Sequence, residues 1–239
     1  AELPEAQERG FSMVATGGWG REELCPYSDI DFLLLADKSD EALATSLAET
    51  LLYPLWDGKV KVGHAVASIR EVADLARGDL ATATGLLDGR LVVGRAERFE
   101  ELQRQTRRAV VPGGNANRFI DELRHSVEER HGRFGGSLYL LEPNIKQGIG
   151  GLRDYAAAHW AAKARWSVNE IGELVPLGEL TRRQAQVLEK GLDYLLTLRC
   201  LLQLERGRAG DQLSFELQEA IAPSLFPYVQ PPENGAIPA

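Results

Sequence analysis

Two aspartates separated by one residue, Asp29 and Asp31, stand at the start of an apolar run that ends at Leu35. In a β-strand, residues i and i+2 point to the same face, so both carboxylates would project together while Ile30 points into the core. Adjacent carboxylates repel one another, and a divalent cation relieves this repulsion. Mg²⁺ binds carboxylate oxygens, keeps positions for water or phosphate oxygens and serves phosphoryl transfer. The spacing therefore predicts a site for Mg²⁺, with Mn²⁺ as the alternative.

A double glycine, Gly17-Gly18, precedes the aspartates. Backbone N–H groups of residues that lack side chains can approach a phosphate chain closely. Arg21 is a candidate fork donor to phosphate, with an ordinary surface arginine as the alternative. Ser28 either contacts phosphate or holds the turn before the aspartates. We expect residues 11–35 to form a strand, a glycine turn, a polar excursion and a second strand; the alternative is a plain hairpin with two solvated aspartates.

Three further segments are expected to build and cover a small mixed sheet around this site. Residues 39–56 have apolar residues at helical spacing and should cover one side of the sheet. Residues 59–68 alternate like a strand that contains His64, for which a structural role is expected and a ligand or catalytic role is the alternative. Residues 79–94 predict a short helix followed by a strand.

The second half of the chain has a helical pattern. Pro112 and the glycines after it indicate a linker over residues 111–117, where we place a domain boundary. Helices are expected over residues 118–134, 153–166 and about 182–206, the last opened by a capping box at Thr181 and Gln184. Trp160 and Trp166 are expected in the core.

The run LEPNIKQGIGGLRD, residues 141–154, lies between two of these helices. Its three glycines suggest a loop that packs closely against something, and Lys146 and Arg153 are placed to contact a nucleotide across a cleft. The alternative is a tight interhelical turn that needs glycine for its geometry alone.

Composition limits the function classes. The 239 residues are 44% hydrophobic and 26% charged, with no apolar run of membrane-spanning length and no signal-peptide pattern. The net charge is −8, and residues 1–60 contain twelve Asp/Glu against four Lys/Arg. An acidic catalytic half argues against a nonspecific nucleic-acid binder. Two cysteines favour a reducing, cytoplasmic setting, and the ends of the sequence suggest a segment of a longer protein.

The motifs carry a family resemblance. A double glycine, about ten residues, then Asp-x-Asp and an apolar run resembles the nucleotidyltransferase fold shared with DNA polymerase beta. The string GGWGREELCPYSDIDFLLL resembles more narrowly the N-terminal catalytic region of bacterial PII uridylyltransferase/uridylyl-removing enzymes, as do LEPNIKQGIGGLRD and DQLSFELQEAIA. The resemblance extends from Phe11 to Ala222. It departs from the family at Trp19, where tyrosine is more usual, and around Lys59.

The resemblance implies an α+β fold. A nucleotidyltransferase catalytic domain would occupy residues 1–111, and an all-α nucleotide- and substrate-binding domain would occupy residues 118–239. The fold needs a third carboxylate on a neighbouring strand, for which Asp88 is the candidate because its Asp-x-Arg-Leu string resembles that of the related glutamine synthetase adenylyltransferase. The implied catalytic and metal-binding residues are Asp29, Asp31 and Asp88; the implied nucleotide-binding residues are Gly17, Gly18, Arg21, Ser28, Lys146 and Arg153.

The resemblance also implies a reaction, the transfer of UMP from UTP to a tyrosine of a PII nitrogen-signalling protein with release of pyrophosphate. No His-Asp doublet occurs in the chain, so the family's hydrolytic uridylyl-removing domain is expected to be absent from this segment. One alternative is an adenylyltransferase acting on glutamine synthetase or PII. Another is a non-catalytic module that senses nucleotide. Neither nucleic acid nor membrane is an expected partner, and the sequence does not decide between UTP and ATP.

Overall fold

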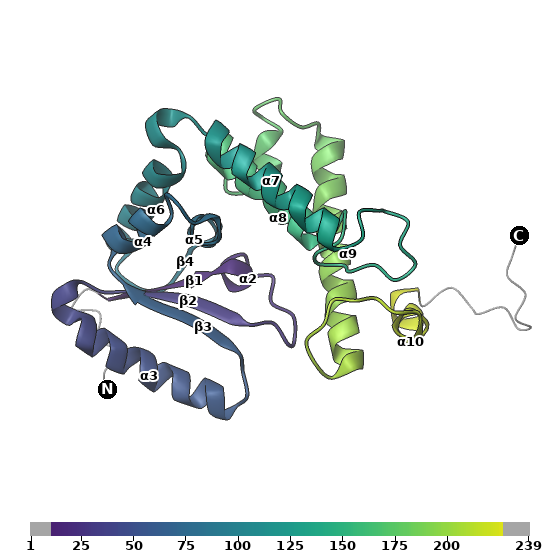
Figure 1. Ribbon diagram of the computed structural model, residues 1–239, viewed down its shortest axis with the longest axis horizontal. Coiled ribbons are helices and arrows are strands. Elements are labelled where there is room, and N and C mark those ends of the chain that lie inside the picture. The colour runs from purple at the N-terminus through teal and green to yellow at the C-terminus, as the bar shows by residue number, and fades with distance from the viewer. Residues whose placement is uncertain (1–10, 227–239) are drawn as a thin grey trace, which may run out of the picture.

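The computed structural model describes residues 11–226, apart from the side chains of Glu41 and Leu43 (Figure 1). Its centre is a four-stranded mixed sheet with the order β3-β2-β1-β4. The strands are β1 Ser12–Thr16, β2 Ile30–Leu35, β3 Val62–Ala67 and β4 Arg90–Gly94. β1 is antiparallel to both β2 and β4, whereas β2 and β3 are parallel.

Helices cover both faces of the sheet and continue beyond it. The helices of the first half are α2 Gly17–Gly20, α3 Glu41–Asp57, α4 Ile69–Leu75, α5 Leu80–Leu87 and α6 Ala96–Val110. Those of the second half are α7 Asn117–Arg133, α8 Leu152–Trp166, α9 Arg182–Arg206 and α10 Phe215–Leu225, and the 3-10 turns are η1 Lys38–Asp40, η2 Pro112–Gly114 and η3 Ile171–Leu174. A mixed sheet followed by helices confirms the expected α+β fold.

Local sequence signals set several helix ends. α9 begins at the predicted capping box, in which the Thr181 hydroxyl accepts from the backbone N–H of Gln184 and the Gln184 side chain accepts from that of Thr181. It ends at Gly207, whose φ of 63° lies in the left-handed region that glycine adopts without strain. α5 begins at Asp79, whose carboxylate accepts from the backbone N–H of Thr82 at 2.8 Å.

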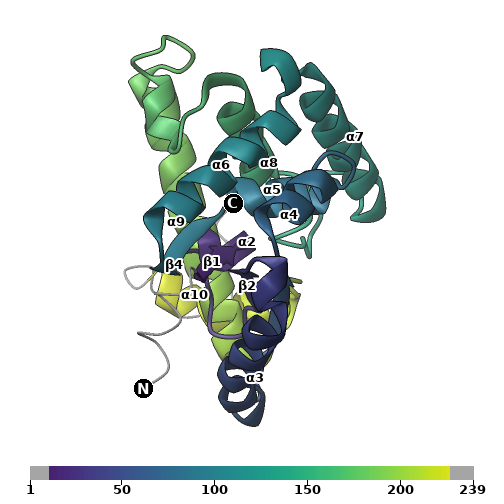
Figure 2. The same cartoon turned by 90° about the vertical axis from the view of Figure 1, so that its left-hand side faces the viewer.

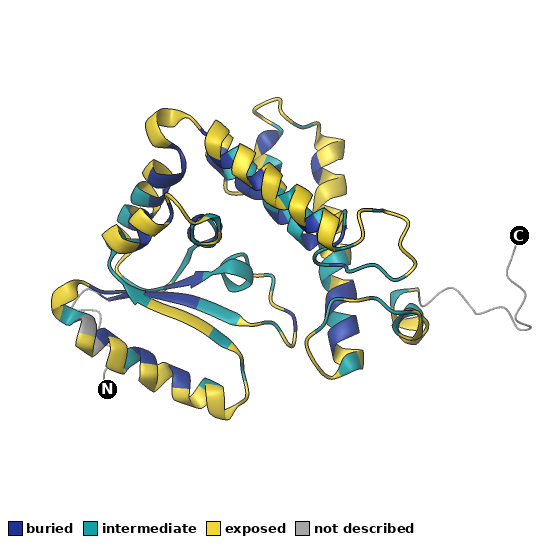
Figure 3. Cartoon of the chain, viewed as in Figure 1, coloured by how far each residue is buried: buried dark blue, intermediate teal, exposed yellow. Residues whose placement is uncertain are grey.

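One face of the sheet packs against α3. Alternation along β2 sends Phe32 and Leu34 to this face, where they meet Ala48 and Leu52. Leu52 is 1% exposed, and its burial contributes roughly 2 kcal/mol relative to an exposed leucine. Figure 2 shows α3 on one side of the strands and α4 and α6 on the other, and Figure 3 shows the buried and exposed sides of α3. This confirms the expected cover on one side of the sheet.

The other face shares its core with the helical half. Leu33 and Leu35 of β2 belong to the same buried cluster as Phe119 and Leu123 of α7 and Trp160 of α8. The cluster therefore crosses the linker at residues 111–117, whose role as a domain boundary stays a prediction. The outermost parts of both expected domains, residues 1–10 and 227–239, lie outside the described residues.

Two sequence expectations need correction. Trp160 is buried as expected, but Trp166 is 38% exposed, because it lies in the last turn of α8 where its indole N–H donates to Glu179 at 2.9 Å. Asp88 was expected on a strand, but it lies at the C-terminal end of α5, just before β4 begins.

Candidate functional site

The glycine turn lies directly beside the second aspartate. β1 and β2 pair antiparallel with Thr16 opposite Asp31, so Gly17, the next residue, begins α2 at that point. Gly17 has a φ of 55°, and a Cβ added to it would lie 3.3 Å from Oδ2 of Asp31. The structure thus brings together the two parts of the motif that the sequence separates by more than ten residues.

Asp29 and Asp31 form the acidic side of the site. Asp29 is exposed immediately before β2, whereas Asp31 is partly buried. Burial, followed by the negative charge of Asp29, raises the pKa of Asp31. Mutual repulsion between partly desolvated carboxylates is relieved by a cation. Because Mg²⁺ completes its shell with water and substrate phosphates, two carboxylates fit it, although residues 11–226 contain no group of three acidic, histidine or cysteine side chains that would hold a metal.

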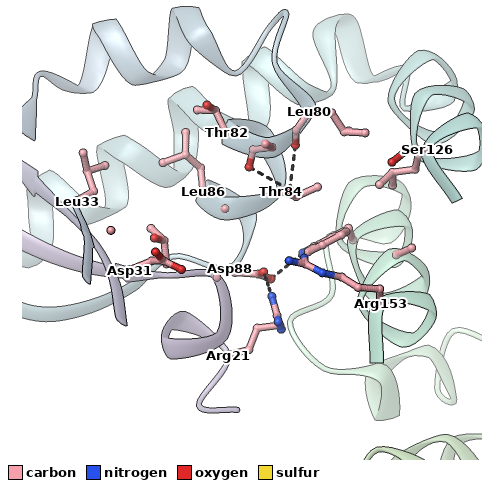
Figure 4. A pocket seen from close by; sticks show the side chains of 18 of the residues that line it. Arg21, Asp31, Leu33, Leu80, Thr82, Thr84, Leu86, Asp88, Ser126 and Arg153 are labelled. Atoms are coloured by element: carbon pink, nitrogen blue, oxygen red, sulfur yellow. Dashed lines mark hydrogen bonds and ion pairs between the residues drawn. The ribbon is translucent and has the colours of Figure 1, made fainter. Parts of the chain in front are cut away.

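A cleft of about 860 Å³ is lined by Asp31 and by Gly17 of the glycine turn (Figure 4). Its walls come from the sheet at Asp31, from α4 and α5, from α7 at Arg130, and from α8 at Arg153 and Trp160. The volume falls in the range that small-molecule sites occupy. The cleft therefore has an acidic floor on the sheet and a basic wall on the helical half.

Arg153 provides that basic wall, and Lys146 belongs to the loop that precedes α8. The positive charges of both side chains counter the rise in the pKa of Asp31. Burial lowers the pKa of Lys146 and of Arg153, and neighbouring arginines lower both further. Neither side chain donates a hydrogen bond or forms an ion pair within the described part of the chain; Arg153 only lies over the Trp160 ring, at 5.9 Å from its centroid. Two carboxylates and two cations without ion-pair partners in the described residues offer complementary charges to a polyanion and its metal.

The loop that presents Lys146 is shaped by its own side chains. The side-chain oxygen Oδ1 of Asn144 accepts from the backbone N–H of Lys146 at 3.1 Å and of Gln147 at 2.7 Å. A Cβ on Gly148 or Gly151 would overlap backbone oxygens of this loop, at 2.7 Å in each case. These glycines are thus required by the tight turn, which was the alternative interpretation. The turn also fixes the backbone at Lys146, whose N–H donates to the Asn144 side chain and whose carbonyl oxygen accepts from the Arg153 N–H at 2.9 Å.

Asp154 ties this loop to α7. Its carboxylate accepts from Arg130 at 2.5 Å, from the Gly150 backbone N–H at 2.7 Å and pairs with His131 at 2.9 Å. Burial acts to raise the pKa of Asp154, but the hydrogen bonds from Arg130, Gly150 and His131 lower it on balance. The Gly-rich loop is therefore anchored at its end by a buried ion pair.

Asp88 has contacts unlike those of a metal ligand. Its side chain is fully buried and forms a short ion pair with Arg21, accepts from the Trp160 indole N–H at 2.8 Å and lies 3.4 Å from Nζ of Lys163 (Figure 4). Arg21 also pairs with Glu23 at 2.7 Å. Both side chains line the cleft, but each is already engaged in the tie between α2, α5 and α8. Metal binding by Asp88 and phosphate binding by Arg21 stay predictions, which these contacts oppose.

The loop before Asp29 rests on α9. The Ser28 hydroxyl accepts from the Cys25 backbone N–H at 2.9 Å and from Arg199 at 3.2 Å. The Tyr27 backbone N–H donates to the side chain of Gln203 at 3.0 Å. Of the two roles considered for Ser28, holding the turn is the one that these contacts support. A Cβ added to Gly18, by contrast, would meet only the Leu24 side chain, at 3.8 Å, so space alone does not require glycine there.

Sequence reasoning missed three residues of this site, namely Gly63, Arg199 and Gln203. Gly63 stands opposite Asp31 in β3, and a Cβ added to it would overlap Oδ1 of Asp31. The sequence feature that could have identified Gly63 is a glycine inside an otherwise alternating strand, because such a glycine often marks the close approach of another group. The signal at Gln203 was a polar residue within the apolar pattern of α9, where it is 0% exposed.

The fold and the site together indicate the class of this protein. A mixed sheet with a Gly-Gly helix start beside an Asp-x-Asp strand, completed by a helical half, is a nucleotidyltransferase-like α+β arrangement. Comparison with known proteins narrows the class: residues 118–229 match the family model described as GlnD PII-uridylyltransferase. The chain is therefore related to the PII uridylyltransferases, which confirms the resemblance recognised in its motifs.

Individual relatives match both halves of the chain. A bifunctional uridylyltransferase/uridylyl-removing enzyme of Bradyrhizobium diazoefficiens is 40% identical over 223 residues, 93% of this chain and 24% of that protein. Proteins of the same name from Cereibacter sphaeroides and Novosphingobium aromaticivorans are 38% and 36% identical, over 92% and 89% of this chain and 23% of each relative. The chain thus spans about a quarter of the length of these relatives. No helix within residues 11–226 combines the length and apolar character needed to cross a bilayer.

Proposed function

We propose that this chain carries the nucleotidyl-transfer site of a uridylyltransferase, which moves UMP from UTP to a tyrosine hydroxyl of a PII signalling protein in the cytoplasm. The observation that carries the proposal is a cleft with Asp31 on its floor and Arg153 on its wall. Asp29 adds negative charge at Asp31 and Lys146 adds positive charge, and neither Lys146 nor Arg153 has an ion-pair partner within residues 11–226. A nucleoside triphosphate with its metal satisfies both sides at once. The names of the relatives support uridylyl transfer and the PII acceptor.

Each group has a role in this proposal. Asp29 and Asp31 would hold Mg²⁺ or Mn²⁺. The bound ion would neutralise charge on the triphosphate and lower the pKa of the attacking hydroxyl. The backbone N–H groups of Gly17 and Gly18 lie at the start of α2 and would approach the β- and γ-phosphates. Lys146 and Arg153 would close on the same phosphates from the helical half.

The reaction is an in-line displacement. The tyrosine oxygen forms a bond to the α-phosphorus while the bond from this phosphorus to the α–β bridging oxygen breaks. Pyrophosphate leaves with the bridging oxygen, and the hydroxyl proton passes to water. The cations of the helical half stabilise the charge that develops on the leaving pyrophosphate, because they act inside a partly desolvated cleft.

In this proposal Asp88 and Arg21 have a supporting role, which their contacts favour. Asp88 accepts from Trp160 of α8 and pairs with Arg21, which follows α2. This tie fixes the glycine turn against the helical half, so it sets the width of the cleft. Ser28 likewise holds the turn before Asp29 through Cys25 and Arg199.

The test is incubation of the protein with Mg²⁺, a PII protein and either UTP or ATP, scored by the mass of the acceptor. Addition of one UMP, lost in Asp31→Asn, supports the proposal. Addition of AMP instead identifies the adenylyltransferase alternative. Binding of Mg²⁺-UTP by calorimetry without any transfer identifies the non-catalytic sensing module.

A further inference from the structure

The strand next to Asp31 has a free outer edge. β3 stands at the end of the sheet order and pairs only with β2 within residues 11–226. The backbone oxygens of Lys61 and Ala67 accept from β2, at 2.9 Å and 3.2 Å. Because residues of a parallel strand alternate in the neighbour that they bond, the N–H and C=O groups of Val62, His64 and Val66 point outward. Figure 1 shows this strand at the open border of the sheet.

The catalytic carboxylate leans over this edge strand. Gly63 stands opposite Asp31, and its missing Cβ leaves the space that Oδ1 of Asp31 occupies. Gly63, His64 and Ala65 are exposed and line the same cleft as Asp31. The cleft is thus continuous with the outer edge of β3. Only the small residues Gly63 and Ala65 lie on the face between this edge and Asp31.

The edge lacks the features that usually protect a free strand. Natural edge strands carry charged residues, proline or bulges that discourage pairing. Residues 62–67 contain neither a charged residue nor proline, and β3 pairs with β2 in continuous register. An edge strand of this kind is a template for the addition of an extended peptide.

The charge around the edge selects among peptides. Lys59 and Lys61 lie just before β3 and are exposed, and residues 58–70 contain no Asp or Glu, in a chain whose net charge is −8. Arg70, beyond the other end of β3, is paired with Asp74. A local excess of positive charge attracts a segment with acidic residues and raises its rate of association.

We propose that β3 is the docking site for an extended, acidic segment of the acceptor polypeptide. The segment pairs with the outward backbone groups of Val62, His64 and Val66, and its tyrosine side chain passes over Gly63 to the oxygen of Asp31. This inference rests on the proposed function, which requires a protein hydroxyl to arrive beside Asp31. The cations Lys146 and Arg153 hold the nucleotide from the opposite wall, so acceptor and nucleotide enter from different sides.

His64→Pro tests the docking directly. The N–H of His64 points away from β2, so proline removes a donor that the sheet does not use, and proline is tolerated at such edge positions. We expect the KM for the PII acceptor to rise about tenfold or more, because the substitution removes one backbone hydrogen bond and blocks close pairing. The affinity for Mg²⁺-UTP measured by calorimetry should stay unchanged. His64→Ala is the matched control for the side chain and should keep an acceptor KM near that of the wild type.

Circular dichroism and thermal unfolding establish that His64→Pro is folded. If it is not, the double variant Lys59→Glu, Lys61→Glu takes its place, and a severalfold rise in acceptor KM that weakens with added salt is expected. An acceptor KM within twofold of the wild type in a folded variant overturns the docking site. A wild-type chain that binds PII but transfers nothing contradicts the proposed function instead, and loss of that binding in His64→Pro would still support the docking site.

Discussion

The backbone N–H of Tyr27 donates a hydrogen bond of 3.0 Å to the side-chain oxygen of Gln203, a residue of α9 that lies 176 positions further along the chain. The Gln203 side chain is completely buried, and its Nε2 has no partner among the described residues. A half-satisfied amide in a core costs stability. Its contact with the turn before Asp29 indicates a positioning role, since through it the helical half holds the loop that we propose to be catalytic.

Gln203→Leu should therefore separate activity from stability. Leucine removes a buried donor without a partner, and the exposed Tyr27 backbone can turn to water, so the melting temperature should stay the same or rise. Transfer should slow by about ten- to a hundredfold, because small displacements of reacting groups have effects of that size. Enzyme assays measure the transfer rate, and thermal unfolding measures the melting temperature. Leu202→Ala, a neighbouring core truncation that should lower the free energy of unfolding by about 3 kcal/mol, is the control for general loosening; a fully active Gln203→Leu would remove the positioning role.

Asp31→Asn should abolish transfer and stabilise the metal-free protein at neutral pH. Burial and the charge of Asp29 raise the pKa of Asp31 in the folded state. A carboxyl with a raised folded pKa contributes stability below its unfolded value of about 4, and this contribution is lost as the pH rises through the folded pKa. Asparagine removes that loss, so the difference in melting temperature between variant and wild type should be larger at pH 7 than at pH 4.

The metal response of the same variant gives a second measurement. Mg²⁺ with UTP should raise the melting temperature of the wild type, because a ligand that binds the folded state stabilises it. Asp31→Asn should show little of this rise. An equal shift in both proteins would mean that the metal and nucleotide bind elsewhere.

Asp88→Asn distinguishes a structural tie from a metal ligand. The Asp88 carboxylate pairs with Arg21 and Lys163, and its removal leaves the largely buried Lys163 without a carboxylate and Arg21 with Glu23 alone. We expect a loss of about 3 kcal/mol in the free energy of unfolding. The Mg²⁺ concentration for half-maximal activity should not change. A large increase in that concentration, with little loss of stability, would instead restore Asp88 as the third metal ligand.

Arg153→Ala and Lys146→Ala should weaken nucleotide use while the fold is kept. Neither side chain forms an ion pair within the described part of the chain, so the loss of either leaves no buried carboxylate without a partner. We expect kcat/KM for UTP to fall by about ten- to a thousandfold, the usual range for donors that stabilise developing charge. Arg165→Ala, an exposed arginine in the last turn of α8, is the control and should behave as the wild type. Unchanged kinetics in both variants would remove the helical half from the nucleotide site.

Much of this arrangement could be predicted from local patterns. Contiguous residues with a distinct periodicity or turn chemistry encode three of its elements. These are the strand that carries Asp31, the helix α9 with its cap at Thr181, and the loop that contains Lys146. Strand alternation predicts that Asp29 and Asp31 point the same way; because Asp29 precedes β2, this stays a prediction. These features require no knowledge of how distant segments pack.

The contacts between distant segments could not be predicted in the same way. Gly63 matters because parallel pairing sets it opposite Asp31, and Gln203 matters because α9 lies against the loop before Asp29. Asp88 was misplaced because its string suggested a strand, whereas it lies in the turn after α5, where it contacts Arg21 and, on α8, Trp160 and Lys163. Periodicity gives the elements, whereas packing decides which polar groups meet.

The central claim is that Asp29 and Asp31 hold a metal and triphosphate against Lys146 and Arg153 for transfer to a protein hydroxyl. Its most direct measurement is the mass of a PII protein after incubation with this chain, UTP and Mg²⁺, with Asp31→Asn and omission of Mg²⁺ in parallel. The account predicts one added UMP on a tyrosine with the wild-type chain, and none with Asp31→Asn or without the metal. UMP transfer at the wild-type rate by Asp31→Asn would contradict it.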